Sequence, residues 1–281
     1  MLVPRRQSVK KKAAWSKDRC GDGNPVSLKY GYLERNRVFE PLRGNGGAMI
    51  VDAKSAAAEL WFGYGRWNAK YWFVGMEPGG DDGHASYDAW HDLGATELID
   101  CREHHLWKRK VLGLEDRTWT RWHDDAPGRR TQPTWRRLIQ LLLAFEGEPT
   151  DLDVVHEYQK HKLGRLDGDT AVIELGALHA PSLATKVDRE LHRQSRIAIM
   201  RARFIENEPA FAVCYGYAFA NQYARVVGRE FDADGFAWCG PTLCVLTPGP
   251  TSRPPSPAAH PTWWIEKGRE MRRLIDNSRG H

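Results

Sequence analysis

Four short apolar runs, separated by helix-like segments, constrain the fold more than any other feature of this sequence. They cover residues 71–75, 170–175, 210–215 and 242–247. Runs of this length and composition are typical of buried strands, and their alternation with helices is the pattern of a parallel sheet with crossover connections. The sequence therefore predicts an α/β fold with three layers, α/β/α, around a central four-stranded parallel sheet.

Helical segments are expected over residues 53–61, 135–145, 187–206, 218–227 and 263–275. Residues 81–132 show little apolar periodicity and are expected to form an insertion. Residues 248–261 contain six prolines, which favour a loop over a helix or central strand. We expect one domain over residues 21–281, preceded by a basic arm over residues 1–20.

The net charge of +5 is unevenly distributed. Residues 1–19 carry seven Lys and Arg side chains against one acid, Asp18, which suits an arm along nucleic-acid phosphates or a solvated tail. The twelve tryptophans, several beside arginines, suit stacking on unpaired bases or ordinary core packing. On the predicted helix 187–206, arginines are expected opposite the apolar stripe, facing phosphates or only solvent. These phosphate-binding candidates are Arg189, Arg193 and Arg196.

The five cysteines are an odd number without a C-x-x-C pair, which indicates reduced thiols and a cytoplasmic protein. We find neither a signal peptide nor an apolar run of the roughly 18 to 20 residues that a spanning helix needs, and so expect no membrane partner. We expect a monomer.

The most specific motif follows the first apolar run. Gly75 ends that run, and Glu77 precedes the turn Pro78-Gly79-Gly80. A carboxylate held at a strand end is suited to orient a water molecule or to stabilise a developing cation. Tight turns between a strand and a helix also use such residues for purely structural reasons.

The segment Gly75-Met76-Glu77-Pro78-Gly79 resembles the first motif of the uracil-DNA glycosylase superfamily, which is G-Q-D-P-Y-H in its best-known branch and G-x-N-P-G in others. That superfamily has one α/β/α domain with a four-stranded parallel sheet. Its first motif follows strand one, and an H-P-S loop follows strand four. Here a proline-rich loop ending in His260-Pro261-Thr262 follows the fourth run. The resemblance extends in element order over about residues 50–277, and only the first motif matches closely.

The resemblance implies that Glu77 is the main catalytic residue, acting on water and on an oxocarbenium-like transition state. Gly79 replaces a tyrosine that excludes 5-substituted bases, which implies room for a larger base. The base pocket would also include Gly75, Met76 and Pro78. Aromatic candidates for stacking on a flipped base are Tyr87 and Trp90.

Glu174 is the polar residue near the end of the second run, where uracil-specific members of the superfamily place a base-binding asparagine. A carboxylate accepts a hydrogen bond from the exocyclic amine of cytosine and opposes the O4 acceptor of uracil. The residue therefore favours a cytosine-type base, unless it only pairs with a structural arginine.

The loop after the fourth run departs from the superfamily, because Gly249 stands where the histidine is expected. His260, eleven residues later, is the second catalytic candidate. It either reaches back to the base or caps the last helix. The loop also provides three candidates for DNA contact and duplex wedging. These are Thr251, Ser252 and Arg253.

No cofactor is expected. The cysteines lack the spacing of the iron–sulfur branches of the superfamily, and the zinc deaminase signature is absent. A group of possible zinc ligands lacks a second paired set, so its signal is weak and we expect no metal. Its members are Cys101, His104, His105 and His123.

These observations predict a DNA glycosylase that flips a base out of DNA and hydrolyses its N-glycosidic bond. The expected substrate is a modified cytosine, with room for a bulky 5-substituent, or uracil. A bulky modified cytosine would suit defence against phages. One alternative is an inactive DNA- or nucleotide-binding module of the same fold. Another is a metal-dependent nuclease that uses Asp81, Asp82 and nearby histidines.

Overall fold

The structure is a computed structural model that describes residues 53–76, 83–113, 122–123, 131–176, 178–179, 188 and 190–279. All of these belong to one unit of the chain, Pro41–His281. The predicted basic arm, residues 1–20, lies outside the described residues.

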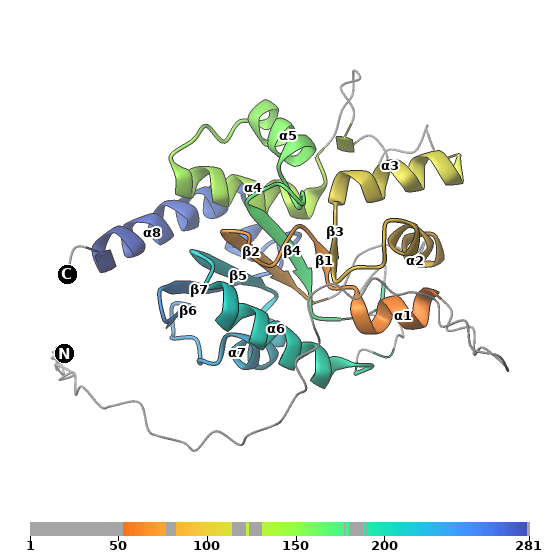
Figure 1. Ribbon diagram of the computed structural model, residues 1–281. Coiled ribbons are helices and arrows are strands. Elements are labelled where there is room, and N and C mark those ends of the chain that lie inside the picture. Colours follow the sequence, from red (N-terminus) through yellow and green to blue (C-terminus); the bar gives the residue numbers. More distant parts are fainter. Residues whose placement is uncertain are drawn as a thin grey trace, which may run out of the picture. The chain divides into compact units, whose positions relative to one another are not determined.

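The described residues form a mixed sheet of seven strands (Figure 1). In space the order is β3-β1-β4-β2-β5-β7-β6. The four inner strands β4, β2, β5 and β7 are parallel, whereas β1 runs antiparallel to β4 and β6 antiparallel to β7. The strands are β1 (Gly63–Tyr64), β2 (Tyr71–Gly75), β3 (Leu98–Ile99), β4 (Thr170–Glu174), β5 (Phe211–Tyr215), β6 (Phe236–Cys239) and β7 (Thr242–Thr247).

The α/β class is confirmed, but a sheet of only four parallel strands was a wrong prediction. β1 and β3 have two residues each, too few to give an apolar run in the sequence. β6 forms a tight hairpin with β7, with Cys239 paired to Thr242. The additional strands therefore extend the predicted parallel core at both of its edges.

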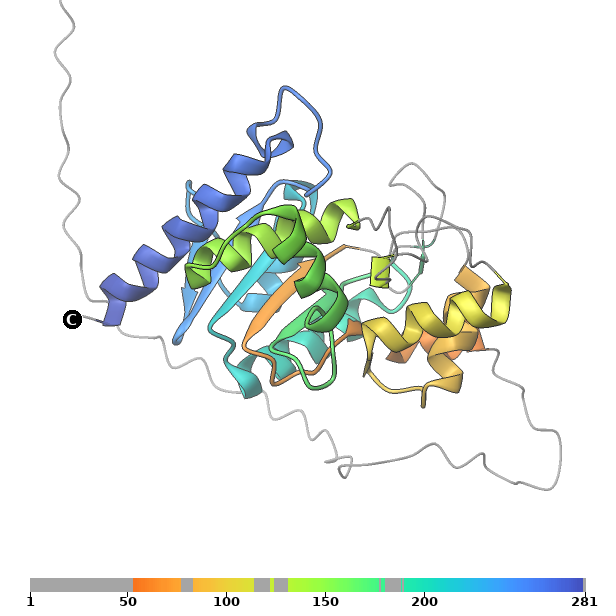
Figure 2. The same cartoon turned by 90° about the horizontal axis from the view of Figure 1, so that it is seen from above.

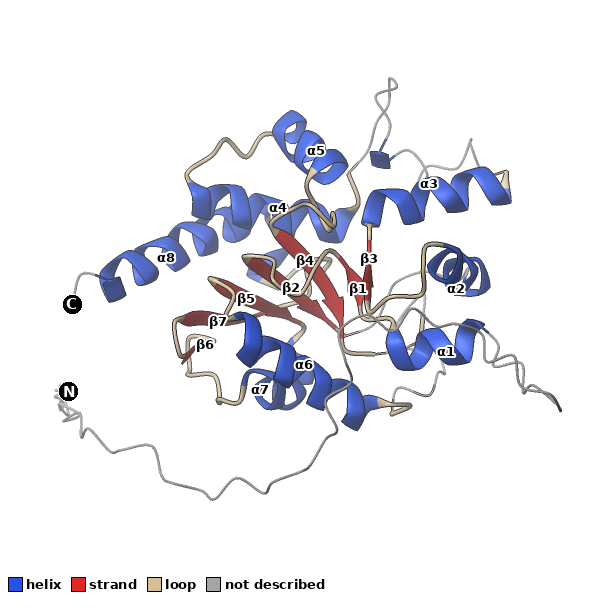
Figure 3. Cartoon of the chain, in the orientation of Figure 1, coloured by secondary structure: helices blue, strands red, loops and turns tan. Residues whose placement is uncertain are grey.

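Helices cover both faces of the sheet (Figure 3). Tyr71 and Phe73 of β2 pack toward α4 and α8, and the alternating Trp72 and Val74 pack toward α6 and α7. This alternation is the normal consequence of strand geometry. The helices concerned are α4 (Pro133–Glu146), α6 (Arg193–Asn207), α7 (Ala220–Val227) and α8 (Pro261–Arg279).

α4 and α8 pack closely because of a glycine. An added Cβ atom at Gly268 of α8 would overlap the backbone carbonyl oxygen of Leu141 in α4. α4 itself begins at Pro133, with the Gln132 side chain accepting the Trp135 amide, and ends at Gly147 in the left-handed conformation. Residues of α4 and α8 line one of the two large hydrophobic clusters.

The predicted insertion, residues 81–132, is partly regular. Figure 1 shows α2 (Gly83–Asp92) and α3 (Cys101–Leu112) beside the sheet edge that carries β1 and β3, and Figure 2 shows the two helices next to each other in the turned view. A third hydrophobic cluster joins this region to α1 (Ala53–Leu60). α5 (Leu152–His161) packs on α4.

No helix within the described ranges is long and apolar enough to cross a membrane. The four cysteines of those ranges are free thiols.

Candidate functional site at the carboxyl edge of the sheet

The carboxyl ends of the four parallel strands form the candidate site. Gly75 is paired in register with Glu174, and Tyr215 with Thr247. After β2, the next of the four parallel strands along the chain is β4, on one side of β2. After β5 it is β7, which lies in the opposite direction along the sheet, so the loops after β2 and β5 diverge. Loops that diverge in this way mark the crevice in which open parallel sheets bind their ligands.

A hydrogen bond between side chains crosses the end of β2. The hydroxyl of Tyr215 donates to Oε1 of Glu174 at 3.1 Å. A Cβ atom at Gly75 would overlap Oε2 of Glu174 and the Tyr215 hydroxyl. A side chain at this position would displace one of these two groups, so glycine at the first residue of the glycosylase-like motif allows the bridge to form.

Tyr215 is held in its protonated form. Burial, followed by the charge of Glu174, raises the pKa of Tyr215 well above its usual value of 10. The hydroxyl of Tyr223 donates to the backbone oxygen of Tyr215 at 2.9 Å and fixes the end of β5. Sequence analysis missed Tyr215, although a tyrosine in the last position of an apolar run is a visible signal.

Arg196 of α6 holds the chain where it leaves β4. Its guanidinium donates to the carbonyl oxygens of Glu174 at 2.8 Å and Leu175 at 3.0 Å, with longer bonds to those of Gly176 and Ala58. It also lies 4.1 Å from the centre of the Phe62 ring. Burial lowers the pKa of Arg196 to about 10.

The predicted orientation of the α6 arginines was wrong. Arg196 is fully buried, and Arg193 is 4% exposed and forms an ion pair with Glu190 at 2.9 Å. Both lie on the same buried face as Ile197 and Met200, because positions three and four apart share one side of a helix. Arg189 lies outside the described residues.

The loops after β2 and β4 start side by side. Gly75 accepts a hydrogen bond from the Leu175 amide at 2.9 Å, and the carbonyl of Met76 accepts one from the Gly176 amide. Met76 is buried. Glu77, Pro78 and Gly79 lie outside the described residues, as do Asp81 and Asp82.

The two proposed stacking residues, Tyr87 and Trp90, are buried in the third hydrophobic cluster. The Tyr87 hydroxyl accepts a hydrogen bond from the His179 amide at 3.2 Å, and the Trp90 indole donates to the Thr96 carbonyl at 2.7 Å. Core packing accounts for both side chains as they are arranged here.

The loop after β7 presents Thr251 and Arg253 at the surface, with Ser252 half-buried. It begins with a turn in which the Ser252 amide donates to the Gly249 carbonyl at 2.9 Å. His260 is exposed, and its Nδ1 accepts a hydrogen bond from the Thr262 amide at 3.4 Å. Of the two alternatives for His260, the structure has the helix cap, at the start of α8.

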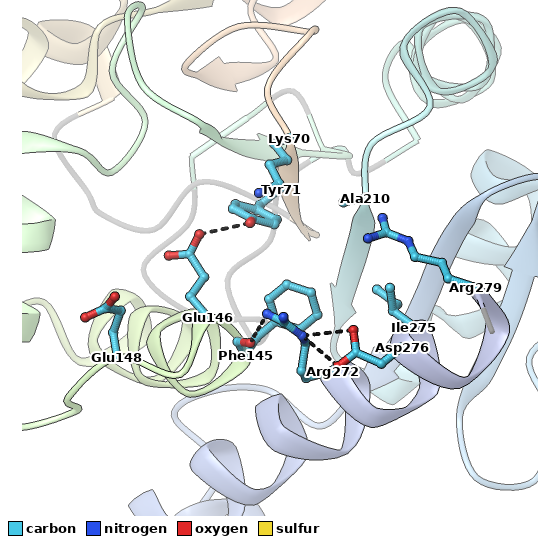
Figure 4. A pocket seen from close by; sticks show the side chains of 10 residues that line it. All are labelled: Lys70, Tyr71, Phe145, Glu146, Glu148, Ala210, Arg272, Ile275, Asp276 and Arg279. Atoms are coloured by element: carbon cyan, nitrogen blue, oxygen red, sulfur yellow. Dashed lines mark hydrogen bonds and ion pairs between the residues drawn. The ribbon is translucent and has the colours of Figure 1, made fainter.

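A cavity of about 400 Å³ lies at the opposite, amino edge of the sheet (Figure 4). Lys70 and Ala210, which directly precede β2 and β5, line it. Tyr71 donates to Glu146 across it at 2.9 Å, and Arg272 pairs with Asp276. None of the residues predicted for function lines this cavity, and parallel sheets bind ligands at the other edge.

Comparison with known proteins finds no match for this chain, either among protein-family models or among curated proteins.

Proposed function

We propose that this protein is a DNA glycosylase that resembles the uracil-DNA glycosylase superfamily, flips a base out of DNA and hydrolyses its N-glycosidic bond. One observation carries the proposal. The Glu174 carboxylate, held by the Tyr215 hydroxyl, lies over Gly75, the first residue of the glycosylase-like motif. A polar group able to bind a base thus adjoins the start of the segment that contains Glu77.

The proposed roles follow from the chemistry of each group. Glu77 orients the attacking water and stabilises positive charge on the sugar. Glu174 accepts a hydrogen bond from the exocyclic amine of a cytosine-type base. Tyr215 donates a hydrogen bond to Oε1 of Glu174 and thereby fixes the orientation of this carboxylate. Gly79 leaves space for a substituent on the base.

Position 249 is a glycine, so a histidine at this position cannot stabilise the leaving base and another group must do so. His260 caps α8 in this structure, so backbone amides or water take over that part of the reaction. The exposed side chains of Thr251 and Arg253 are suited to contact DNA beside the flipped nucleotide. A bulky modified cytosine as substrate would suit a role in defence against phages.

Base release from DNA tests the proposal. Three DNAs are compared by mass spectrometry, namely one with uracil, one unmodified and one with glucosylated hydroxymethylcytosine, each with and without brief exposure to a chelator. We expect a free modified cytosine and an abasic site, with release that persists in the chelator because the chemistry uses no metal. Strand cutting that is abolished by chelation, without free base, would instead indicate a metal-dependent nuclease.

A second candidate is a DNA-binding module without catalysis. The cap formed by His260 and the presence of Gly249 favour it, because both remove a histidine from the expected loop position. Tight DNA binding with no free base from any of the three DNAs would favour this candidate over the enzyme.

A further inference from the structure

Three buried side chains with metal-ligating atoms meet beside α3. Cys101 and His105 are four residues apart and therefore share one face of the helix. His123 comes from the short turn Trp122–His123. One potential ligand atom from each lies within 4.8 Å of the other two, and the residues are 0%, 7% and 3% exposed.

The His105 ring has a defined tautomer. Its Nδ1 lies 2.7 Å from the backbone oxygen of Cys101, which can only accept, and 3.7 Å from the Cys101 sulfur, so Nδ1 carries the proton. The lone pair is then on Nε2. A histidine that donates one ring N–H to a carbonyl and coordinates through the other nitrogen is the common arrangement at metal sites.

His123 provides the second, independent observation. Neither of its ring nitrogens makes a hydrogen bond of normal geometry among the described residues, although both atoms are buried and the backbone of Lys160 lies nearby. Buried polar atoms nearly always have a partner, and the loss of one costs about 1 to 3 kcal/mol. The His123 ring lies 5.1 Å from the His105 ring, centre to centre, so the missing partner belongs at this cluster.

We propose that Cys101, His105 and His123 bind a structural zinc ion. One thiolate and two imidazoles suit Zn²⁺, and they supply three of its four tetrahedral ligands. Among the described residues no other His, Cys, Asp or Glu joins the group. On binding, the Cys101 thiol transfers its proton to solvent and its sulfur bonds to the metal.

His104 is not a ligand, although it lies next to His105 in the sequence. Its Nδ1 is 3.0 Å from the Tyr64 hydroxyl and its Nε2 is 3.2 Å from the Ser86 carbonyl. Both ring nitrogens are thereby occupied. The sequence spacing alone does not separate His104 from His105, whereas the side-chain contacts do.

The burial of all three ligands makes the role structural, because a substrate needs access to a catalytic metal. The ion would fasten the Trp122–His123 turn to the start of α3. The same turn is held from α5, where Gln159 donates to the Trp122 carbonyl at 2.8 Å. Trp122 also packs on Trp135 of α4 at 5.5 Å between ring centres.

Metal content of the whole chain, purified without a histidine tag, tests the proposal. After incubation with excess Zn²⁺ and gel filtration, we expect about one zinc per chain, and below about a tenth of that in Cys101→Ser and in His123→Ala. Cys239→Ser and His161→Ala, which change residues outside the cluster, should keep the metal. Circular dichroism establishes that each variant is folded.

Cobalt provides a second measurement that reports the sulfur ligand directly. Co²⁺ added to the metal-free protein should give a thiolate-to-metal charge-transfer band that is present in Cys239→Ser and absent in Cys101→Ser. Wild-type protein that is folded, retains no zinc and shows no such band would overturn the proposal. Because both readouts are metal binding and not base release, this result is independent of the glycosylase assay.

Discussion

The hydroxyl of Tyr215 donates a hydrogen bond to Oε1 of Glu174 over the carboxyl end of strand β2. The two residues end β5 and β4, the strands on either side of β2. The side chains of Glu174 and Tyr215, from the two strands next to β2, thus meet above the end of β2, where the glycosylase-like motif begins.

Replacing Tyr215 by phenylalanine keeps the ring and removes the donor. Loss of a hydrogen bond from a neutral donor to a carboxylate costs about 1 to 3 kcal/mol. We therefore expect a decrease of that size in the free energy of unfolding at pH 7. Urea denaturation measures it. Tyr217→Phe is the matched control, because Tyr217 is exposed and should change stability by less than about 0.5 kcal/mol.

Tyr215→Phe should also change how the free energy of unfolding depends on pH above pH 10. Burial first, then neighbouring negative charge, raises the pKa of Tyr215 and of Tyr223 well above 10. The folded state therefore keeps protons that the unfolded state loses above pH 10, so stability is fully present below that pH and is lost as pH rises. Each such group contributes a slope of about 1.4 kcal/mol per pH unit. Tyr215→Phe should reduce the slope by about one group, and an unchanged slope between pH 10 and 11 would contradict the argument.

Gly75→Ala tests the close approach at the end of β2. The added methyl group would overlap both Glu174 and Tyr215, so we expect a loss of about 2 to 3 kcal/mol in unfolding free energy and loss of base release. Gly249→Ala is the stability control, because its Cβ would meet only the Ser252 hydroxyl, at an ordinary 3.7 Å. Equal stability of the two variants would show that the bridge does not require glycine at position 75.

Arg196→Met tests whether the buried guanidinium is structural. Methionine fills similar space but leaves the carbonyls of Glu174 and Leu175 without their donor, so a loss of at least about 3 kcal/mol is expected in urea denaturation. Arg229→Met, at an exposed position, should lie within about 0.5 kcal/mol of the wild type. A decrease of less than about 1 kcal/mol in Arg196→Met would contradict a structural role for Arg196.

Glu174→Gln separates base selection from catalysis. The amide can present a donor as well as an acceptor, so the preference for a cytosine-type base over uracil should fall by roughly tenfold. Competing release of the two bases from one mixture measures the ratio. An unchanged ratio in a folded variant would indicate that Glu174 acts only in the bridge to Tyr215.

The parallel core of the fold was predictable from the sequence because strands buried on both faces are continuous apolar runs. Strands β1 and β3 were not, since two-residue strands leave no pattern. The buried arginines of α6 were assigned to the face opposite the apolar stripe, although their spacing from Ile197 and Met200 puts them on the same side of the helix. The partners of Arg196 include the carbonyls of residues 174–176, about twenty positions away, and only tertiary structure brings them together.

The residues of the candidate site were predictable from the sequence only where a single residue stands out from its neighbours along the chain. Glu174 was identified because a carboxylate ends an apolar run, whereas its hydrogen bond to Tyr215 depends on strand order. In the same way, the C-x-x-H spacing of Cys101 and His104 gave a weak ligand signal. That Cys101 meets His105 and His123 instead appears only in the folded chain.

The most direct test of the central claim compares base release by the wild type with release by Glu77→Gln, on DNA that carries the modified cytosine identified as substrate. Glu230→Gln, which makes the same chemical change at an exposed position, is the control. We predict that free base, measured by mass spectrometry under single-turnover conditions, appears about 10²- to 10⁴-fold more slowly with Glu77→Gln and at the wild-type rate with Glu230→Gln. Release by Glu77→Gln at the wild-type rate would contradict the catalytic assignment, and wild-type protein that binds this DNA and releases no base would contradict the glycosylase itself.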